Sequence, residues 1–250
     1  MRNAILIVTV LAAAVGGCAS HCPLGEPVAS MLRAGLVNDP AQVSRLEKAM
    51  TDKDIADMLD VDVRAKLPTA VAVAKVRSRC SGYQPELVGL DAEELNAWEE
   101  AFKGQDLLTG VQPVSNLALG GAEPTLHSLR AAAARMNCEL LLVYLQADST
   151  VDNFNDAAVL YWTILGLWTV PGSVLEHKTV MQAILVDCRT GMILGTATGD
   201  CHLKKVYPAA FEDVRRAELS KQAPRKALAD LQTGVRGLAG RVVTAALAAR

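Results

Sequence analysis

The residue whose type and position best suit a defined reaction is Cys18, near the amino terminus. It follows a Val-Gly-Gly tripeptide at residues 15–17, which closes an apolar run over residues 5–15 preceded by Arg2. A thiol can be alkylated by a lipid donor, and small residues before it let a peptidase bring the scissile backbone close. The apolar run has signal-peptide length and is too short to remain as a membrane span.

This arrangement resembles the bacterial lipoprotein signal. The resemblance implies that residues 1–17 are a lipoprotein signal peptide and that Cys18 becomes the first residue, carrying palmitate-type acyl chains that anchor it in a membrane. Position 19 is Ala rather than Asp, which by analogy favours the outer membrane, with the protein facing the periplasm. The alternative is an ordinary secretory signal in which Cys18 is a plain cysteine.

No other group of residues has the spacing of a catalytic or metal site. H-E-x-x-H and G-x-S-x-G motifs are absent, and Gly120-Gly121 lacks the rest of a phosphate-binding loop. The histidines are scattered: His21, His127, His177 and His202. His202 beside Cys201 could ligate a metal, but a place at a strand end accounts for both. We therefore expect no catalytic residue, no metal and no cofactor.

The cysteines leave their pairing open. Besides Cys18 there are five: Cys22, Cys80, Cys138, Cys188 and Cys201. An exported chain meets an oxidising compartment, so one or two disulfides can form. No C-x-x-C pair occurs, and spacing selects no connectivity.

Composition indicates a globular chain that does not bind polyanions. Hydrophobic residues make up 51% and charged residues 21%, and the net charge is −2. This supplies enough apolar surface for a core and no basic field. We expect no nucleic-acid partner.

The first half of the chain predicts strands alternating with helices. Residues 67–76 and 139–149 are apolar on both sides, as interior strands are. Asp91 with Glu94 predicts a capped helix over 91–104, and a second helix is expected from Thr125 to Asn137. A weaker strand is expected in the DLLTGVQPV stretch at 106–114.

The second half predicts a hairpin and two helices. Strands over 177–187 and 192–200 should flank a turn at Arg189-Thr190-Gly191. From Ala209 the chain turns helical, and Pro224 is expected to divide it into two helices. Ahead of the core, residues 18–64 predict a tether with a helical segment, so the domain proper is 65–250.

Two patterns, MNCELLLVYLQ at 136–146 and ILVDCRTGMILGTATG at 184–199, together with this order of elements, resemble a shared fold. It is the fold of the CsgG curli-export lipoproteins, the amino-terminal domain of TolB and periplasmic activator lipoproteins such as LpoB. The resemblance covers roughly residues 65–245. It implies an α/β (α+β) fold, a mixed β-sheet flanked by helices, and a role in envelope assembly, secretion or partner activation.

The segment from Ala157 to Val170 has no charge and departs from that family. It is too short for a membrane span, and charged residues bound it on both sides. It could be a buried crossover or an exposed element that meets lipid or a partner, and its aromatic rings suit an interface. The residues predicted to make this contact are Tyr161, Trp162, Leu165, Leu167 and Trp168.

The function expected from these features is that of a lipid-anchored accessory or assembly protein of the cell envelope. Its partners would be the membrane, through the anchor, and an envelope protein or a second copy of the chain. Two alternatives remain at this stage. One is an oligomeric secretion channel of CsgG type, although residues 161–170 are apolar on both faces rather than alternating. The other is a hydrolase of unrecognised type.

Overall fold

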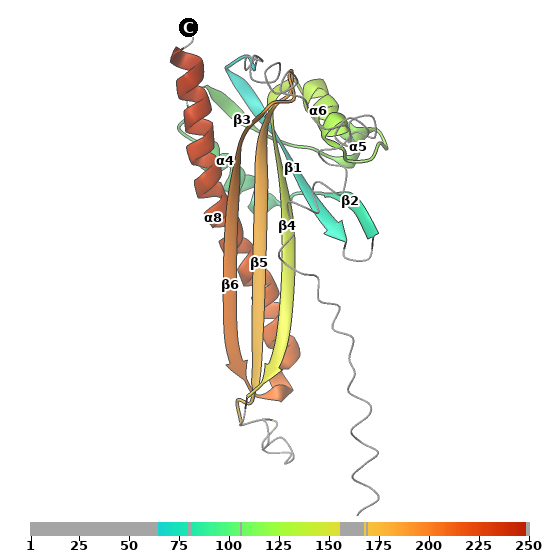
Figure 1. Cartoon of the computed structure of the whole chain (residues 1–250), viewed down its shortest axis with the longest axis vertical. Coiled ribbons are helices and arrows are strands. Elements are labelled where there is room, and N and C mark those ends of the chain that lie inside the picture. The colour runs from blue at the N-terminus through green and yellow to red at the C-terminus, as the bar shows by residue number, and fades with distance from the viewer. Residues whose placement is uncertain (1–64, 80–81, 106, 156–167, 169, 249–250) are drawn as a thin grey trace, which may run out of the picture.

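The computed structural model describes residues 65–79, 82–105, 107–155, 168 and 170–248 (Figure 1). Six strands form one sheet: β1 (Thr69–Arg79), β2 (Gly82–Val88), β3 (Leu108–Pro113), β4 (Cys138–Phe154), β5 (Ser173–Asp187) and β6 (Ile193–Tyr207). The helices are α4 (Ala92–Phe102), α5 (Asn116–Leu119), α6 (Leu126–Arg135), the short 3₁₀ helix η3 (Ala209–Phe211) and α8 (Glu212–Ala248).

The sheet is mixed, as the sequence predicts. Its strand order is β2-β1-β4-β5-β6, and β3 pairs with the same edge of β1 as β2 does. Strands β1 and β4 run parallel, whereas β4, β5 and β6 run antiparallel. The prediction that 67–76 and 139–149 are interior strands is confirmed, because β1 and β4 each have partners on both sides.

Helices cover both faces of the sheet around β1 and β4. Val71 and Leu142 point into a cluster with Trp98 of α4 and Leu231 of α8. The alternate positions on the same two strands point the other way, into a cluster built on α6. Strands buried on both faces favour apolar residues at successive positions, which explains the VAVA run at 71–74 and the LLLVYL run at 140–145. The buried exception in β1, Lys75, forms an ion pair with Glu94 of α4.

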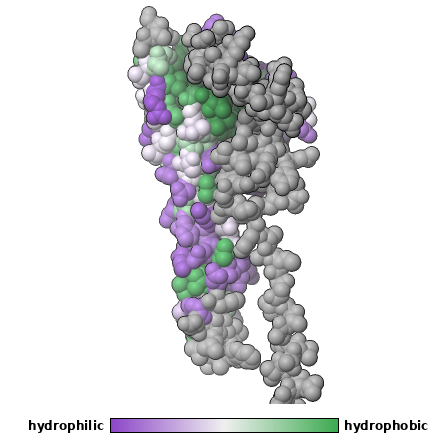
Figure 2. Space-filling view, viewed as in Figure 1, coloured by the Kyte–Doolittle hydropathy of each residue, from purple (hydrophilic) through white to green (hydrophobic). Residues whose placement is uncertain are grey.

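Strands β4, β5 and β6 continue well past the end of β1, as Figure 1 shows. At about 3.4 Å per residue a strand of 15 residues spans about 50 Å. Helix α8, with 37 residues, spans about 55 Å at 1.5 Å per residue and crosses behind all three strands (Figure 1). Along this far half only α8 covers the sheet among the described elements. The other face shows mainly hydrophilic residues (Figure 2).

Helix α8 approaches β6 so closely that one position must be glycine. A Cβ atom on Gly199 would collide with the backbone oxygen of Ala227 and the backbone nitrogen of Leu231. Because both are backbone atoms of a helix, neither can move aside alone. Gly199 therefore sets the distance between α8 and the sheet at the crossing.

The helix ends follow the sequence signals. The Asp91 side chain accepts from the backbone N–H of Glu94 and the Glu94 side chain accepts from that of Asp91, which makes a capping box. Asn137 has a φ of 58° and ends the turn between α6 and β4. Both predictions are confirmed.

Pro224 does not divide the last helix, so that prediction is wrong. Helix α8 is continuous with Pro224 inside it. A proline costs a helix about 3 kcal/mol through its missing N–H and its ring. Leu219, Ala223 and Ala227 are fully buried on either side of it, and this packing outweighs the loss.

Several strand assignments also differ from the prediction. Strand β2 was not predicted, and β4 continues to Phe154 rather than ending near 149. The predicted hairpin is present, but β5 begins at Ser173 rather than 177 and β6 continues to Tyr207 rather than 200. Pairing with β5 holds the extension of β4 in place through its polar residues, up to Phe154 opposite Ser173. The predicted signal peptide, tether and first helical segment, residues 1–64, lie outside the described residues.

Candidate contact surface at the end of the long strands

One of the predicted contact residues, Trp168, lies within the described part of the chain, and it is exposed. Its side chain is 57% accessible, and its ring meets that of Phe211 edge to face, with 5.9 Å between the centroids. The remaining predicted site residues lie outside the described residues: Cys18, Tyr161, Trp162, Leu165 and Leu167. Among the predicted contact residues, Trp168 is therefore the one whose exposure the structure describes.

Hydrogen bonds extend the β4–β5 ladder at the end of the sheet where Trp168 meets Phe211. The Asn155 backbone N–H donates to the Gly172 carbonyl at 2.8 Å, and the Asn155 side chain donates to the Pro171 carbonyl at 2.9 Å. These bonds continue the β4–β5 ladder beyond its last pair. They tie the connection that carries Trp168 to the ends of the strands.

Three further apolar side chains are exposed at this end. Val206 is the penultimate residue of β6, Phe211 ends η3, and Val214 lies in the first turn of α8. The term distal apolar surface is used here for Trp168, Val206, Phe211 and Val214. Isolated exposed hydrophobic residues are ordinary, but an aromatic pair flanked by valines marks a candidate contact site.

Sequence reasoning missed three of these four residues, although two carried a signal. Val206 lies on the same face of β6 as Lys204, the polar face of the hairpin. Val214 falls outside the buried stripe of α8 that begins at Leu219. An apolar residue on the polar face of an amphipathic strand or helix is the pattern from which Val206 and Val214 could have been predicted.

Six charged groups near this surface are paired with each other. Arg216 bonds both Asp152 and Glu212, which ties the start of α8 to the end of β4. Lys205 contacts Glu218 at 2.6 Å and Arg215 contacts it at 2.8 Å. These two cations lower the pKa of Glu218 to about 2. Because these charges are satisfied internally, binding at this end would depend on its apolar groups.

A set of polar side chains lies on the α8-facing side of β4 and β5 in the far half of the sheet, and it includes buried, half-buried and exposed members. This polar layer consists of Gln146, Asp148, Thr150, His177 and Thr179. Thr179 donates to Asp148 at 2.6 Å, Gln146 donates to the same carboxylate at 2.8 Å, and the Thr150 hydroxyl lies 2.7 Å from His177 Nδ1. The layer separates the main core from a small cluster at the far end, formed by Leu175, Tyr207 and Leu219.

The polar layer contains a hydroxyl, an imidazole and a carboxylate, the ingredients of a catalytic triad, but its setting is structural. His177 is 4% exposed, and burial lowers its pKa. Its Nε2 is 3.8 Å from Asp148 Oδ1, beyond hydrogen-bond distance. The buried imidazole therefore offers almost no surface to a substrate.

The other histidines and cysteines are not gathered into a site either. His202 lies on the open face beside Glu176, while Cys201 packs against the core on the α8 side. Neighbours on a strand point to opposite faces, so this pair cannot ligate one metal ion. Among the described residues no group of three or more His, Cys, Asp or Glu side chains could hold a metal.

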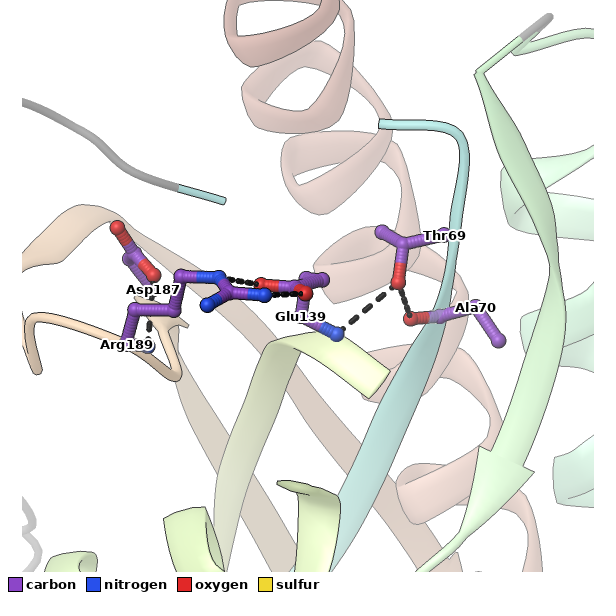
Figure 3. A network of polar contacts seen from close by, with 5 residues as sticks. All are labelled: Thr69, Ala70, Glu139, Asp187 and Arg189. Carbon is purple, nitrogen blue, oxygen red and sulfur yellow. Dashed lines mark hydrogen bonds and ion pairs between the residues drawn. The ribbon is translucent and has the colours of Figure 1, made fainter. Parts of the chain in front are cut away.

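The turn between β5 and β6 carries a polar network at the opposite end of the molecule (Figure 3). The Asp187 carboxylate accepts from the backbone N–H of Arg189, and Arg189 forms a bidentate ion pair with Glu139. The Glu139 backbone N–H in turn donates to Thr69. Gly191 has a φ of 78°, which glycine adopts freely. The network joins this turn to the starts of β4 and β1 and serves the fold.

No protein-family model and no curated protein matches this chain. Solved structures give weak similarities. The LpoB C-terminal domain from Salmonella enterica is 14% identical over 59% of this chain and 91% of its own, with a TM-score of 0.31. Lipoprotein GNA1162 from Neisseria meningitidis is 13% identical over 62% of this chain and 97% of its own, also at 0.31.

The PelC dodecamer from Paraburkholderia phytofirmans is 12% identical over 69% of this chain and 94% of its own, with a TM-score of 0.28. Scores at this level carry no inference about what this chain does.

Within the part of the chain that the structure describes, no helix has both the length and the apolar character to cross a membrane.

Proposed function

We propose that this protein is a lipid-anchored accessory or assembly protein of the bacterial cell envelope that acts by contact rather than by catalysis. The anchor would be at Cys18 and would hold the protein on the outer membrane, facing the periplasm. The observation that carries the contact role is the exposed pair of Trp168 and Phe211 at the end of the long strands.

The physical properties of this pair favour binding. Aromatic side chains bury a large area on binding and have few rotatable bonds whose freedom is lost. The indole ring also offers one N–H donor at its edge. Most of the charged groups beside the pair are already in ion pairs, so an apolar partner surface would not have to displace them. An anchored chain also searches a confined volume, which makes a weak contact effective.

The lipid anchor is tested by replacing Cys18 with Ala and fractionating cells. The variant should leave the membrane fraction and should lack the mass of the acyl chains. Cys201→Ala is the matched control, since it removes another cysteine and should stay at the membrane. A Cys18→Ala chain that remains membrane-bound with unchanged mass would contradict the anchor.

The contact role is tested with the double variant Trp168→Ser and Phe211→Ser in the full chain. Crosslinking in intact cells and flotation with phospholipid vesicles report association with protein and with membrane. Both residues are exposed, so the melting temperature should barely change while one of the two associations is lost.

Leu117→Ser is the matched control, because Leu117 is 92% exposed on α5, away from the distal apolar surface. It should retain both associations. Loss of stability without loss of association in the double variant would show that the pair serves the fold instead. A large particle in mild detergent that the double variant no longer forms would identify a second copy as the partner.

A further inference from the structure

We propose that Cys138 and Cys188 are a site of thiol oxidation, joined by a disulfide when the protein meets a disulfide donor. Such a donor is expected in the compartment to which the predicted signal directs the chain. The two residues lie at the start of β4 and just after the end of β5. The spacing of the cysteines in the sequence does not favour this pair, but the register of the strands does.

The register sets the two backbones at a suitable separation. Leu140 lies opposite Asp187, and the Cys188 backbone N–H donates to the Glu139 carbonyl at 2.9 Å, so Cys188 lies opposite Glu139. Cys138 is the next residue along. Opposed Cα atoms are about 5 Å apart and consecutive ones 3.8 Å, which places the two Cα atoms roughly 6 Å apart. That separation is the commonest one for disulfides.

A bulge turns both side chains to the same face. In a regular strand, Cys138 and Glu139 would point to opposite faces, and Cys188 would share the face of Glu139. The register between β1 and β4 instead runs from Ala70 opposite Cys138 to Val71 opposite Leu140, so Glu139 is the extra residue. As a result, Cys138 and Cys188 both pack into the cluster built on α6.

The third described cysteine cannot take the place of either partner. Cys201 packs against the cluster on the α8 side, so the sheet separates it from the other two. Cys138 and Cys188 both pack into the cluster on the α6 side, the opposite side of the sheet from Cys201. Among the described cysteines, the pair is therefore specific.

The reaction consists of two exchange steps. The Cys188 thiolate attacks a low-molecular-weight disulfide, forms a mixed disulfide and releases one donor thiol. The Cys138 thiolate then attacks Sγ of Cys188, forms the internal disulfide and releases the second donor thiol. The protein loses two protons and two electrons, and the donor disulfide takes up the electrons and becomes two thiols.

The timing of this reaction follows from burial. Cys138 is 2% exposed, and burial raises the pKa of Cys188 to about 12. Little attacking thiolate exists at neutral pH in the folded chain. The disulfide should therefore form while the chain folds. A chain that has already folded in the reduced state should oxidise at least about ten times more slowly than a chain that is still folding.

The test is oxidative refolding of the purified full chain with oxidised and reduced glutathione, followed by alkylation of free thiols and trypsin digestion without reductant. Trypsin releases Cys138 within residues 136–178 and Cys188 within residues 179–189. We expect these two peptides to be linked, with a mass two hydrogens below their sum. The peptide of residues 190–204, which holds Cys201, should be alkylated.

Two further measurements keep the result decisive. Reductant should lower the melting temperature of the oxidised chain by on the order of 5–10 °C, because the bond closes a loop that contains β4 and β5. Cys138→Ser should abolish the link and the reductant effect, while Cys201→Ser should keep both. Alkylated Cys138 and Cys188 after refolding, or either one linked to Cys22 or Cys80, would overturn the proposal.

Discussion

The two halves of the long sheet are built on different principles. Around β1, apolar residues fill both faces, and helices from both sides cover them. Beyond β1, α8 covers one face of the sheet, on which β4 and β5 carry the polar layer, and the other face is mainly hydrophilic (Figure 2). The near half therefore holds most of the buried apolar area that stabilises the fold. The far half extends a surface away from it.

Strand β4 passes through both halves, and its residues on the α8 side change from apolar to polar between them. Toward α8, the strand presents Leu140, Leu142 and Tyr144 in the near half and then Gln146 and Asp148 in the far half. The backbone pairing continues unchanged across this point. Because the backbone pairing is continuous, the far half of the sheet can be rigid without a second large core.

The largest expected effect comes from a core aromatic in the near half. Trp98 is fully buried; its ring stacks on Phe102 with the centroids 6.2 Å apart and makes a tilted contact with Tyr144 at 5.4 Å. Trp98→Ala should lower the free energy of unfolding by about 3–5 kcal/mol. Chemical denaturation followed by circular dichroism measures the loss.

Trp168→Ala is the matched control in the far half. Its ring is exposed, so the expected loss is within about 0.5 kcal/mol. Equal losses for Trp98 and Trp168 would remove the distinction between the halves. They would also show that Trp168 is needed by the fold rather than available for contact.

The next effect concerns the crossing of α8 over β6. Gly199→Ala would place a Cβ atom against the helix backbone at Ala227 and Leu231. Overpacking of this kind costs typically about 1–3 kcal/mol. The melting temperature should fall, because α8 must move away from the sheet that it covers.

Gly237→Ala is the control for this substitution. A Cβ at Gly237 meets nothing within 4 Å, and the residue lies inside the same helix. Alanine stabilises a helix interior by about 0.5–1 kcal/mol relative to glycine. The two substitutions should therefore change stability in opposite directions, and a stabilising Gly199→Ala would contradict the close approach.

The same contrast explains what the sequence could and could not predict. Strand interiors and helix caps depend on local residues, so the apolar run from Leu140 to Leu145 and the capping box at Asp91 identified their elements correctly. Pro224 misled because tertiary packing against the sheet offsets a local cost. The polar end of β4 looked like a loop, since its strand state depends on pairing with β5, a partner distant in sequence.

The candidate site was predictable to a similar degree. Trp168 stood out because tryptophan is rare in this chain, but its contact with Phe211 depends on how η3 returns to the end of the strands. No local pattern encodes that meeting. The side-by-side placement of Cys138 and Cys188 likewise depends on the strand register and on the bulge at Glu139.

The smallest expected effect tests the polar layer through pH. His177 is buried in the folded protein, where desolvation and the Arg216 cation lower its pKa, and Asp148 opposes them only in part. The unfolded chain has the ordinary pKa of about 6.5. Below that value the unfolded state binds a proton that the folded state does not. The contribution of His177 to stability is therefore complete above about pH 6.5 and is lost as the pH falls toward its lowered folded pKa.

Glu176 and Glu218 do not obscure this window. Neighbouring cations lower the pKa values of Glu176 and Glu218, so the stability that they contribute is lost only below the ordinary carboxylate range. Melting curves between pH 7.5 and 5 should show wild-type stability falling with a slope of at most about 1.4 kcal/mol per pH unit. His177→Gln should flatten that slope, because it removes the buried imidazole. A wild-type slope that persists in His177→Gln would mean that the far half is not held by a neutral imidazole between the sheet and α8.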